Sequence, residues 1–300
     1  MVSRRRVIQA AAALPALSFL AACGSSSEDS SRPLRVSAIP DQDPDVLTER
    51  EEAFAEYLAK KLDRDVEYVA VPDYSASVAQ LGTGDLDLVF YGGLTGVQAR
   101  KQNPDVTIIG QRDIDEKFTS IFIASADSGI APVSDVAGLS VYASKRFTFG
   151  SETSTSGRLM PSSFLAEAGV EEGDLAGEPG FSGSHDKTIE LVQAGTYEGG
   201  AVNAQVWRSR LEEGTVDTEK VIAVFETPTF HDYHWILREE AEKDFGEGFA
   251  QKLKDALFAM HEDEDGKAVL DLYKAGSIID AKPEDYARIE EAAEKLDLLG

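Results

Sequence analysis

Short apolar runs alternate with longer amphipathic segments in the first part of the chain after residue 33. The segment after the first run carries Leu47, Phe54 and Leu58 at helical spacing, and Asp43 followed by Pro44 is typical of a helix start. Strands that alternate with helices in this way predict parallel βαβ units in an open α/β sheet, whose ligands bind beyond the carboxyl ends of the strands. The predicted strands cover residues 34–39, 66–71, 86–90 and 106–110.

Two further apolar runs indicate where the chain passes between two lobes. Residues 119–124 have a strand pattern that no helical pattern directly follows, and residues 221–225 have another after an intervening α/β pattern. We therefore predict a two-lobed α/β fold, in which each lobe is an open, mostly parallel sheet flanked by helices and the two crossing strands form a hinge. The predicted boundaries assign residues 33–121 and 225–300 to the first lobe and residues 122–224 to the second.

The first residues have the pattern of an export signal. Arginines at positions 4–6 precede an apolar run over residues 7–22, which is too short and wrongly flanked for a typical membrane-spanning helix. The segment resembles a twin-arginine signal, and residues 20–24 resemble a bacterial lipobox. Cys23 is the only cysteine and cannot form an internal disulfide, so we expect it to carry lipid and anchor the exported protein to the outer face of the cell membrane. We predict a signal peptide over residues 1–22 and a lipidated flexible tether over residues 23–32.

The composition is that of a soluble globular protein, with 42% hydrophobic and 28% charged residues. The formal net charge is −25, and no cluster of lysine and arginine interrupts it. Because nucleic-acid phosphates require such clusters, this charge argues against nucleic-acid binding. We expect a monomer that has no nucleic-acid partner and no cofactor.

Two stretches rich in glycine and hydroxyl residues directly precede helical patterns, at residues 149–161 and 181–186. Each should present free backbone N–H groups at a helix N-terminus, where the helix dipole also favours negative charge. Two such ends that face one cavity make an anion site. The candidate ligand-binding residues in these stretches are Ser154, Thr155, Ser156, Ser184 and His185.

The turn at residues 91–93 admits two interpretations. Tyr91, Gly92 and Gly93 follow a predicted strand and precede a helix. They either form a tight connection only or contribute to the ligand site, because they lie at the carboxyl end of the strand. We include Tyr91 and Gly92 among the candidate ligand-binding residues.

An enzyme and a metal site are the alternatives from other classes. A serine of the first stretch with His185 could imitate a nucleophile and its base, but no Gly-x-Ser-x-Gly elbow follows a strand, and Asp186 is poorly placed to orient its own neighbour. His231 and His234 have no matching cysteine, so we expect packing roles for them and no metal. A Ser/His hydrolase is therefore the less favoured alternative.

Four ordered motifs resemble the phosphonate-, phosphite- and phosphate-binding proteins of ABC importers, at residues 73–74, 87–93, 154–157 and 182–185. The resemblance covers nearly all of the chain after the signal. It implies a periplasmic-binding-protein fold of type II that closes on its ligand, with an ABC permease and its ATPase as partners. The sequences of residues 37–43 and 180–186 are most similar to those of a branch labelled selenate-binding. The family residues that hold the oxyanion correspond to Tyr74, Ser154, Thr155, Ser156 and His185.

The chain departs from the family pattern where aminoalkyl phosphonates are held. Members that bind them use acidic residues and a second tyrosine, which correspond by alignment to Gln205, Tyr233 or His234, and Phe118. Without those acids a cationic tail lacks its counter-charge. The resemblance therefore implies a bare tetrahedral oxyanion, with selenate, phosphate, phosphite and methylphosphonate as candidates. A lipoprotein that senses such an anion and signals to a membrane partner is the alternative to a transport role.

The number of protons on the anion decides what else its site needs. A dianion such as selenate offers only acceptors and suits an all-donor site, whereas a protonated phosphite or phosphate also requires an acceptor. The similarity to the selenate-binding branch and the absence of the amine-binding acidic residues favour the all-donor site. The candidate acceptors for the other case are Asp41, Asp43, Asp73 and Glu152.

Overall fold

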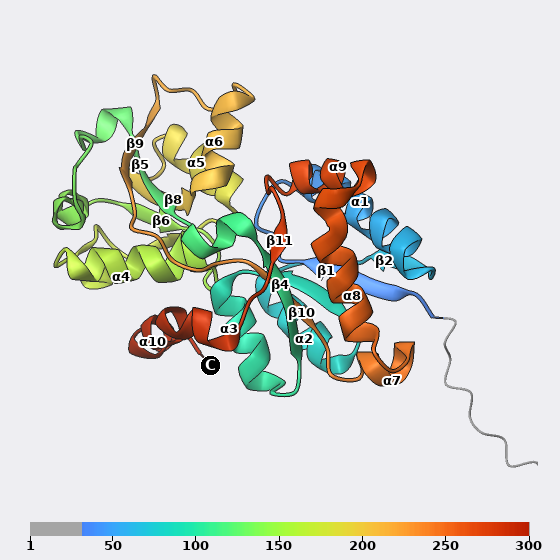
Figure 1. Ribbon diagram of the computed structural model, residues 1–300. Helices are drawn as coiled ribbons and strands as arrows, with labels where there is room; N and C mark the ends of the chain where they lie inside the picture. The colour runs from blue at the N-terminus through green and yellow to red at the C-terminus, as the bar shows by residue number, and fades with distance from the viewer. Residues whose placement is uncertain (1–31, 300) are drawn as a thin grey trace, which may run out of the picture.

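The computed structural model describes residues 32–299, which form two sheets with helices packed on both (Figure 1). The first sheet has the order β11-β4-β10-β3-β1-β2. Strand β1 is parallel to β2 and β3, whereas β10 runs antiparallel between β3 and β4, and β11 is antiparallel to β4. The strands are β1 (Leu34–Ala38), β2 (Val66–Tyr68), β3 (Leu88–Tyr91), β4 (Thr107–Arg112), β10 (His234–Leu237) and β11 (Ile278–Ile279).

The second sheet has the order β7-β6-β8-β5-β9. Strand β6 is parallel to β7 and β8, and β5 runs antiparallel between β8 and β9. The predicted α/β class is confirmed. Both sheets are mixed, because β5 and β10, the first strands after the chain passes from one sheet to the other, run antiparallel to their neighbours. The strands are β5 (Ser120–Ser125), β6 (Phe147–Phe149), β7 (Gly180–Phe181), β8 (Gly199–Asn203) and β9 (Val221–Glu226).

Most helices follow directly from a strand of the sheet on which they pack. The helices on the first sheet are α1 (Pro44–Leu62), α2 (Tyr74–Thr83), α3 (Gly93–Gln102), α7 (Ala241–Phe245), α8 (Phe249–Phe258) and α9 (Glu264–Leu272). Those on the second are α4 (Met160–Glu167), α5 (His185–Gln193) and α6 (Ala204–Glu212), with the turn η4 (Thr155–Leu159) before α4. A last helix, α10 (Ala287–Lys295), ends the described chain. No helix of the described residues is both long and apolar enough to cross a membrane.

Local sequence explains the ends of α1 as predicted. The Asp43 side chain accepts a hydrogen bond from the Asp45 N–H at 2.9 Å, and Pro44 occupies the first helical position, where its missing N–H costs nothing. The helix ends at Asp63, which adopts the left-handed conformation with φ 52°. The buried face of α1 packs in the core of the first sheet.

The chain crosses between the sheets through residues 113–119 and 227–233, which differ from the predicted crossings. Strands β5 and β9 lie wholly in the second sheet, so the predicted boundaries at 121/122 and 224/225 fall inside them. An apolar run indicates a buried strand but does not indicate which sheet the strand joins. The two crossing segments pair with each other, because the N–H groups of Phe118 and Phe230 each donate to the other residue's carbonyl at 2.9 Å.

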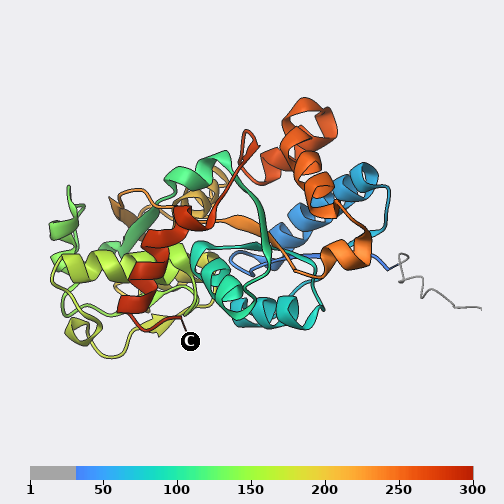
Figure 2. The same ribbon diagram turned by 60° about the horizontal axis from the view of Figure 1, so that its bottom comes forward.

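The helix α10 also departs from its predicted assignment to the first lobe alone. It packs on α3 of the first lobe and also contacts η4 and α4 of the second. Figure 2 shows it crossing in front of α4. The Gln98 side chain of α3 holds the following turn by donating to the Leu298 carbonyl at 2.7 Å. The C-terminal segment therefore bridges the two lobes.

Candidate functional site

Four helical N-termini meet between the two sheets, and the candidate site lies among them. Helices α2 and α3 begin at Tyr74 and Gly93 in the first lobe, and η4 and α5 begin at Thr155 and His185 in the second. The N–H groups of a first helical turn have no acceptor within the helix and carry partial positive charge. Four such ends from both lobes provide a concentration of donors without any cationic side chain.

Contacts across the lobes hold these ends close together. The Leu94 N–H of α3 donates to the Thr155 hydroxyl oxygen at 2.9 Å, and the Tyr74 hydroxyl is hydrogen bonded to Ser154. The Ser154 side chain also caps η4 by accepting from the Gly157 N–H at 3.0 Å. A Cβ atom on Gly92 would lie 3.1 Å from the Thr155 hydroxyl oxygen, so glycine allows this close approach. The hydroxyl residues at 154–156 and Gly92 therefore lie next to each other between the lobes.

His185 presents a single donor to this location. Its Nδ1 accepts a hydrogen bond from the Asn203 N–H at 3.2 Å, and its Nε2 is buried without a partner among residues 32–299. Burial lowers the pKa of His185 below its ordinary value, so the ring is neutral near pH 7. Because Nδ1 accepts, the proton is assigned to Nε2. The imidazole therefore has an N–H donor at Nε2 without an acceptor among residues 32–299.

Asp232 supplies the matching acceptor. One carboxylate oxygen, Oδ1, accepts from the Gly93 N–H at 2.9 Å, and the Thr155 hydroxyl is also hydrogen bonded to this carboxylate. The other oxygen, Oδ2, is buried without a partner in the described part of the chain. Burial raises the pKa of Asp232 to about 7, so the carboxyl gains or loses its proton near neutrality. The side chain can therefore share one proton with a ligand.

Asp232 is not among the four acceptors predicted from the sequence, and three of those four do not reach the site. Asp43 and Asp73 are exposed caps of α1 and α2, and Glu152 is exposed. Asp41 is buried at the interface, where its backbone carbonyl accepts from the His185 N–H at 2.9 Å. The expectation of an all-donor site stays a prediction, and the buried carboxylate of Asp232, with its unpartnered Oδ2, argues against it.

Two predicted residues point away from the other candidates. The Tyr91 hydroxyl donates to the Ser77 carbonyl at 2.8 Å inside the first lobe, because successive side chains of β3 alternate between the faces of the sheet. The Ser184 side chain accepts from the Lys187 N–H at 3.3 Å and caps α5. Both are structural residues in this conformation. The other predicted side chains and Asp232 together form the candidate anion site, which is called the anion site below: Tyr74, Ser154, Thr155, Ser156, His185 and Asp232.

Comparison with known proteins is consistent with this geometry. The family model described as "ABC transporter, phosphonate, periplasmic substrate-binding protein" matches residues 36–286. The chain belongs to this family. It is therefore a periplasmic-type, exported substrate-binding protein of a phosphonate ABC transporter, which works with a permease and an ATPase, and it is not an enzyme.

Two curated relatives and two solved structures illustrate the similarity. A probable ABC transporter phosphite-binding protein, PhnD1 of Prochlorococcus marinus, is 44% identical over 265 residues, which cover 88% of this chain and 89% of the relative. The phosphate-import protein PhnD of Mycolicibacterium smegmatis is 27% identical and covers 65% of this chain and 62% of its own. The structure of PhnD1 with methylphosphonate has a TM-score of 0.87 over 89% of this chain and 99% of that one. A phosphonate-transporter binding component from Pseudomonas aeruginosa, 18% identical, has a TM-score of 0.74 over 90% of this chain and 94% of that one and shares the fold.

His231, within the second crossing, and His234, the first residue of β10, both pack against Tyr286. The His234 ring lies 4.0 Å from the Tyr286 ring, and its Nδ1 faces the Asp232 carbonyl oxygen at 3.2 Å. His231 lies 5.9 Å from the same tyrosine ring. Among residues 32–299, no group of three or more His, Cys, Asp or Glu side chains is arranged to hold a metal.

The raised pKa of Asp232 predicts a pH-dependent gain of stability in D232N. The folded state holds the Asp232 proton more tightly than the unfolded state does, so the stability due to this proton is complete below about pH 4 and is lost as the pH rises through about 7. Asparagine cannot lose a proton. The free energy of unfolding of D232N should therefore increase relative to the native chain between about pH 4 and pH 8, by up to roughly 4 kcal/mol. Thermal unfolding of the ligand-free proteins measures this difference.

D105N is the matched control, because Asp105 is exposed and its carboxylate makes no hydrogen bond within residues 32–299. Its stability should follow that of the native chain at each pH. A constant difference between D232N and the native chain across this pH range would contradict a raised pKa for Asp232.

Proposed function

We propose that the anion site binds a singly protonated tetrahedral phosphorus oxyanion, with methylphosphonate and phosphite as ligands, for delivery to the importer. The observation that supports this most strongly is the unpaired Oδ2 of Asp232 beside a set of donors. A monoprotonated oxyanion offers several acceptor oxygens and one O–H donor. The site offers several donors and one acceptor, so the two hydrogen-bonding patterns are complementary.

The donors come from backbone and neutral side chains of both lobes. The start of η4 lies close to the side chains of His185 and Tyr74. A Cβ atom on Gly157 would be 3.1 Å from the His185 ring, and the Tyr74 hydroxyl is hydrogen bonded to Ser154. Because none of these groups carries a full charge, the site stabilises an anion by hydrogen bonding at contact distance. The Ser120 hydroxyl fixes the turn by donating to the Ser156 carbonyl at 2.7 Å.

The acceptor disfavours selenate and sulfate. A dianion without a proton would face the carboxylate of Asp232 as a repulsive neighbour, unless Asp232 itself supplies a proton. An unpaired or repelled group in a buried site costs about 1–3 kcal/mol, which corresponds to tenfold discrimination or more. The names of the relatives PhnD1 and PhnD, which mention phosphite and phosphate, agree with a phosphorus oxyanion.

Calorimetric titration of the signal-free protein at about pH 8, above the pKa of Asp232, tests this proposal. The native chain should bind methylphosphonate and phosphite at least tenfold more tightly than selenate or sulfate. D232N, which replaces the acceptor oxygen by a donor, should lose at least tenfold in affinity for methylphosphonate and phosphite. Its preference for these anions over selenate and sulfate should therefore decrease. D105N should keep the affinities and the preference of the native chain. Tighter binding of selenate by the native chain would contradict the proposal, and binding of none of these anions would favour a sensor of another ligand.

The two lobes are further proposed to close on the ligand about residues 113–119 and 227–233. The anion site draws residues from both lobes, and beside it the Asp43 N–H donates to the Asp186 carboxylate at 2.7 Å across the interface. A ligand that binds both lobes stabilises only the arrangement in which they are close. The radius of gyration measured by small-angle scattering should therefore decrease when saturating methylphosphonate is added. An unchanged radius in a sample with calorimetrically proven binding would count against this hinge.

We further propose that the exported protein is anchored to the membrane by lipid on Cys23. Cys23 lies outside the described residues, and its support is the lipobox-like sequence together with the absence of other cysteines. The variant C23A should move from the membrane fraction to the soluble fraction of cells that express the full chain, because a lipid chain supplies the affinity for the membrane. A serine substitution within the tether, S26A, is the control. Retention of C23A on membranes after a salt wash would refute acylation at this residue.

A further inference from the structure

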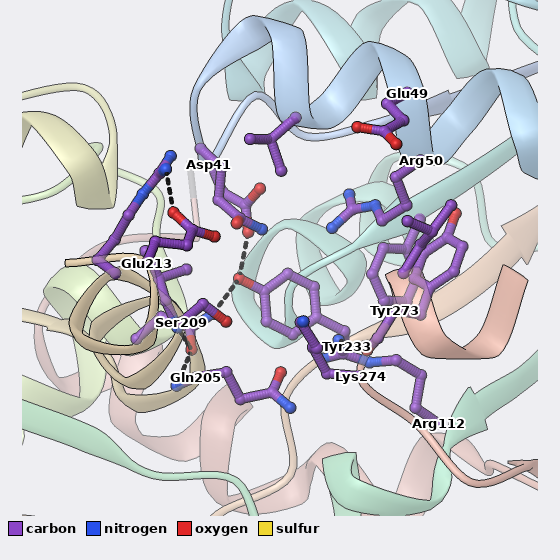
Figure 3. A pocket seen from close by; sticks show the side chains of 17 residues that line it. Asp41, Glu49, Arg50, Arg112, Gln205, Ser209, Glu213, Tyr233, Tyr273 and Lys274 are labelled. Carbon is purple, nitrogen blue, oxygen red and sulfur yellow. Dashed lines mark hydrogen bonds and ion pairs between the residues drawn. The ribbon is translucent and has the colours of Figure 1, made fainter. Parts of the chain in front are cut away.

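A cavity of about 190 Å³ lies between the lobes next to the anion site. It is lined by α1, by the end of β3, by α6 and by the segment that follows α9 (Figure 3). Asp41 and Tyr233 form part of its wall, and the Tyr233 hydroxyl donates to Asp41 Oδ2 at 2.6 Å. Cavities of roughly 150 Å³ in proteins hold a molecule the size of benzene. The space can therefore contain a short ligand tail.

The wall between this cavity and the anion site is one layer of side chains. Asp41 accepts from the His185 N–H through its carbonyl, and Asn203, which also lines the cavity, donates its N–H to the His185 ring. Tyr233 is the direct neighbour of Asp232 in the chain. The Asn203 side chain completes the layer by donating to the Tyr233 hydroxyl at 3.2 Å. A substituent on a bound phosphonate that displaces this hydrogen-bonded layer would enter the cavity.

Arg50 presents unused donors to the cavity. It is only 5% exposed, and its Nε donates to Glu51 at 2.7 Å. Its two terminal nitrogens have no hydrogen-bond partner within residues 32–299, and Figure 3 shows the guanidinium pointing from α1 toward Asp41 and Tyr233. The face of the guanidinium lies over the Tyr273 ring at 4.7 Å, which limits its freedom to turn elsewhere. The side chain is held with two free NH2 groups directed into the space.

The other arginines of the cavity wall are already paired. Arg112 binds both oxygens of Asp115 at 2.7 and 2.8 Å and also the Tyr273 carbonyl. Arg210 is paired with Asp186 and with Glu213. Glu51 is compensated in turn by Arg50 and by the Tyr273 hydroxyl at 2.8 Å. Among the buried side chains of this wall, the terminal nitrogens of Arg50 are thus the cationic donors that remain available. Lys274 also lines the cavity but is exposed, and Asp41 keeps one buried carboxylate oxygen, Oδ1, without a partner within residues 32–299.

We propose that the cavity is an extension of the anion site and that Arg50 selects the tail of a larger phosphonate, so that a carboxylate tail is accepted and an ammonium tail is rejected. This inference rests on the proposed function. A guanidinium with two free N–H groups matches the two oxygens of a carboxylate and repels an ammonium group at the same place. The ligand class is a phosphonate with a carboxylate two or three bonds from phosphorus, such as phosphonoacetate or 3-phosphonopropionate.

Calorimetry on the native chain provides the first test, with phosphonates whose tails differ mainly in charge. 3-Phosphonopropionate should bind at least tenfold more tightly than 2-aminoethylphosphonate, and propylphosphonate, which has a neutral tail, should fall between them. Binding of methylphosphonate without binding of either charged compound overturns the inference and leaves the proposed function intact. Tighter binding of the ammonium compound also overturns it. Failure of methylphosphonate to bind removes the proposed function and the inference together.

The variant R50Q/E51Q provides the second test. Both members of the buried pair are neutralised, so neither of them is left as an unpaired buried charge. The preference for the carboxylate over the ammonium tail should fall to within about threefold of unity, while R208Q, which changes an exposed arginine of α6, should keep the native preference. Methylphosphonate titration and a thermal melt of each variant establish that it is folded. A native preference retained by folded R50Q/E51Q overturns the role of Arg50.

Discussion

The structure depends on a few buried polar atoms that the protein leaves without partners. His185 Nε2, Asp232 Oδ2 and Asp41 Oδ1 are buried and make no hydrogen bond within residues 32–299. Each such group lacks the water that it would contact in the unfolded chain, and the loss costs about 1–3 kcal/mol. A ligand that supplies the missing partners recovers this free energy. The atoms of the anion site, His185 Nε2 and Asp232 Oδ2, therefore weaken the empty protein and increase its affinity for an anion that offers both an acceptor and an O–H donor.

These atoms are brought together by the two crossings of the chain. The second crossing delivers β10 between β3 and β4, so Asp232 lies at the N-terminus of α3. The second lobe contributes η4 and α5 from the opposite side. Because the groups of the site belong to both lobes, the site is complete only when the lobes are close. Under the proposed hinge, binding and closure form one equilibrium.

The strongly acidic surface is compatible with an anion ligand because the site works at short range. Charges at the surface are screened over about 8–10 Å at physiological salt, whereas a buried hydrogen bond acts at contact. The donors of the anion site are backbone N–H groups, hydroxyls and a neutral imidazole. Such a site recognises an anion by the number and position of its protons. Its single carboxyl group has a pKa near neutrality, so the pH decides whether it meets the ligand as an acceptor or as a donor.

The sequence alone determined those features that depend on neighbouring residues in the chain. The cap and proline at residues 43–44 start α1, and the hydroxyl stretch at 154–156 and the end before His185 become helical N-termini, because a helix start is specified by local side chains. Only the tertiary structure decided the role of Asp232, whose partners Gly93 and Thr155 are far from it in sequence. The same holds for the sheet to which β5 and β9 belong and for the inward turn of Tyr91. An apolar strand pattern carries no information about its neighbours, and a polar residue acquires its pKa and its partners only from the surroundings in which the fold buries it.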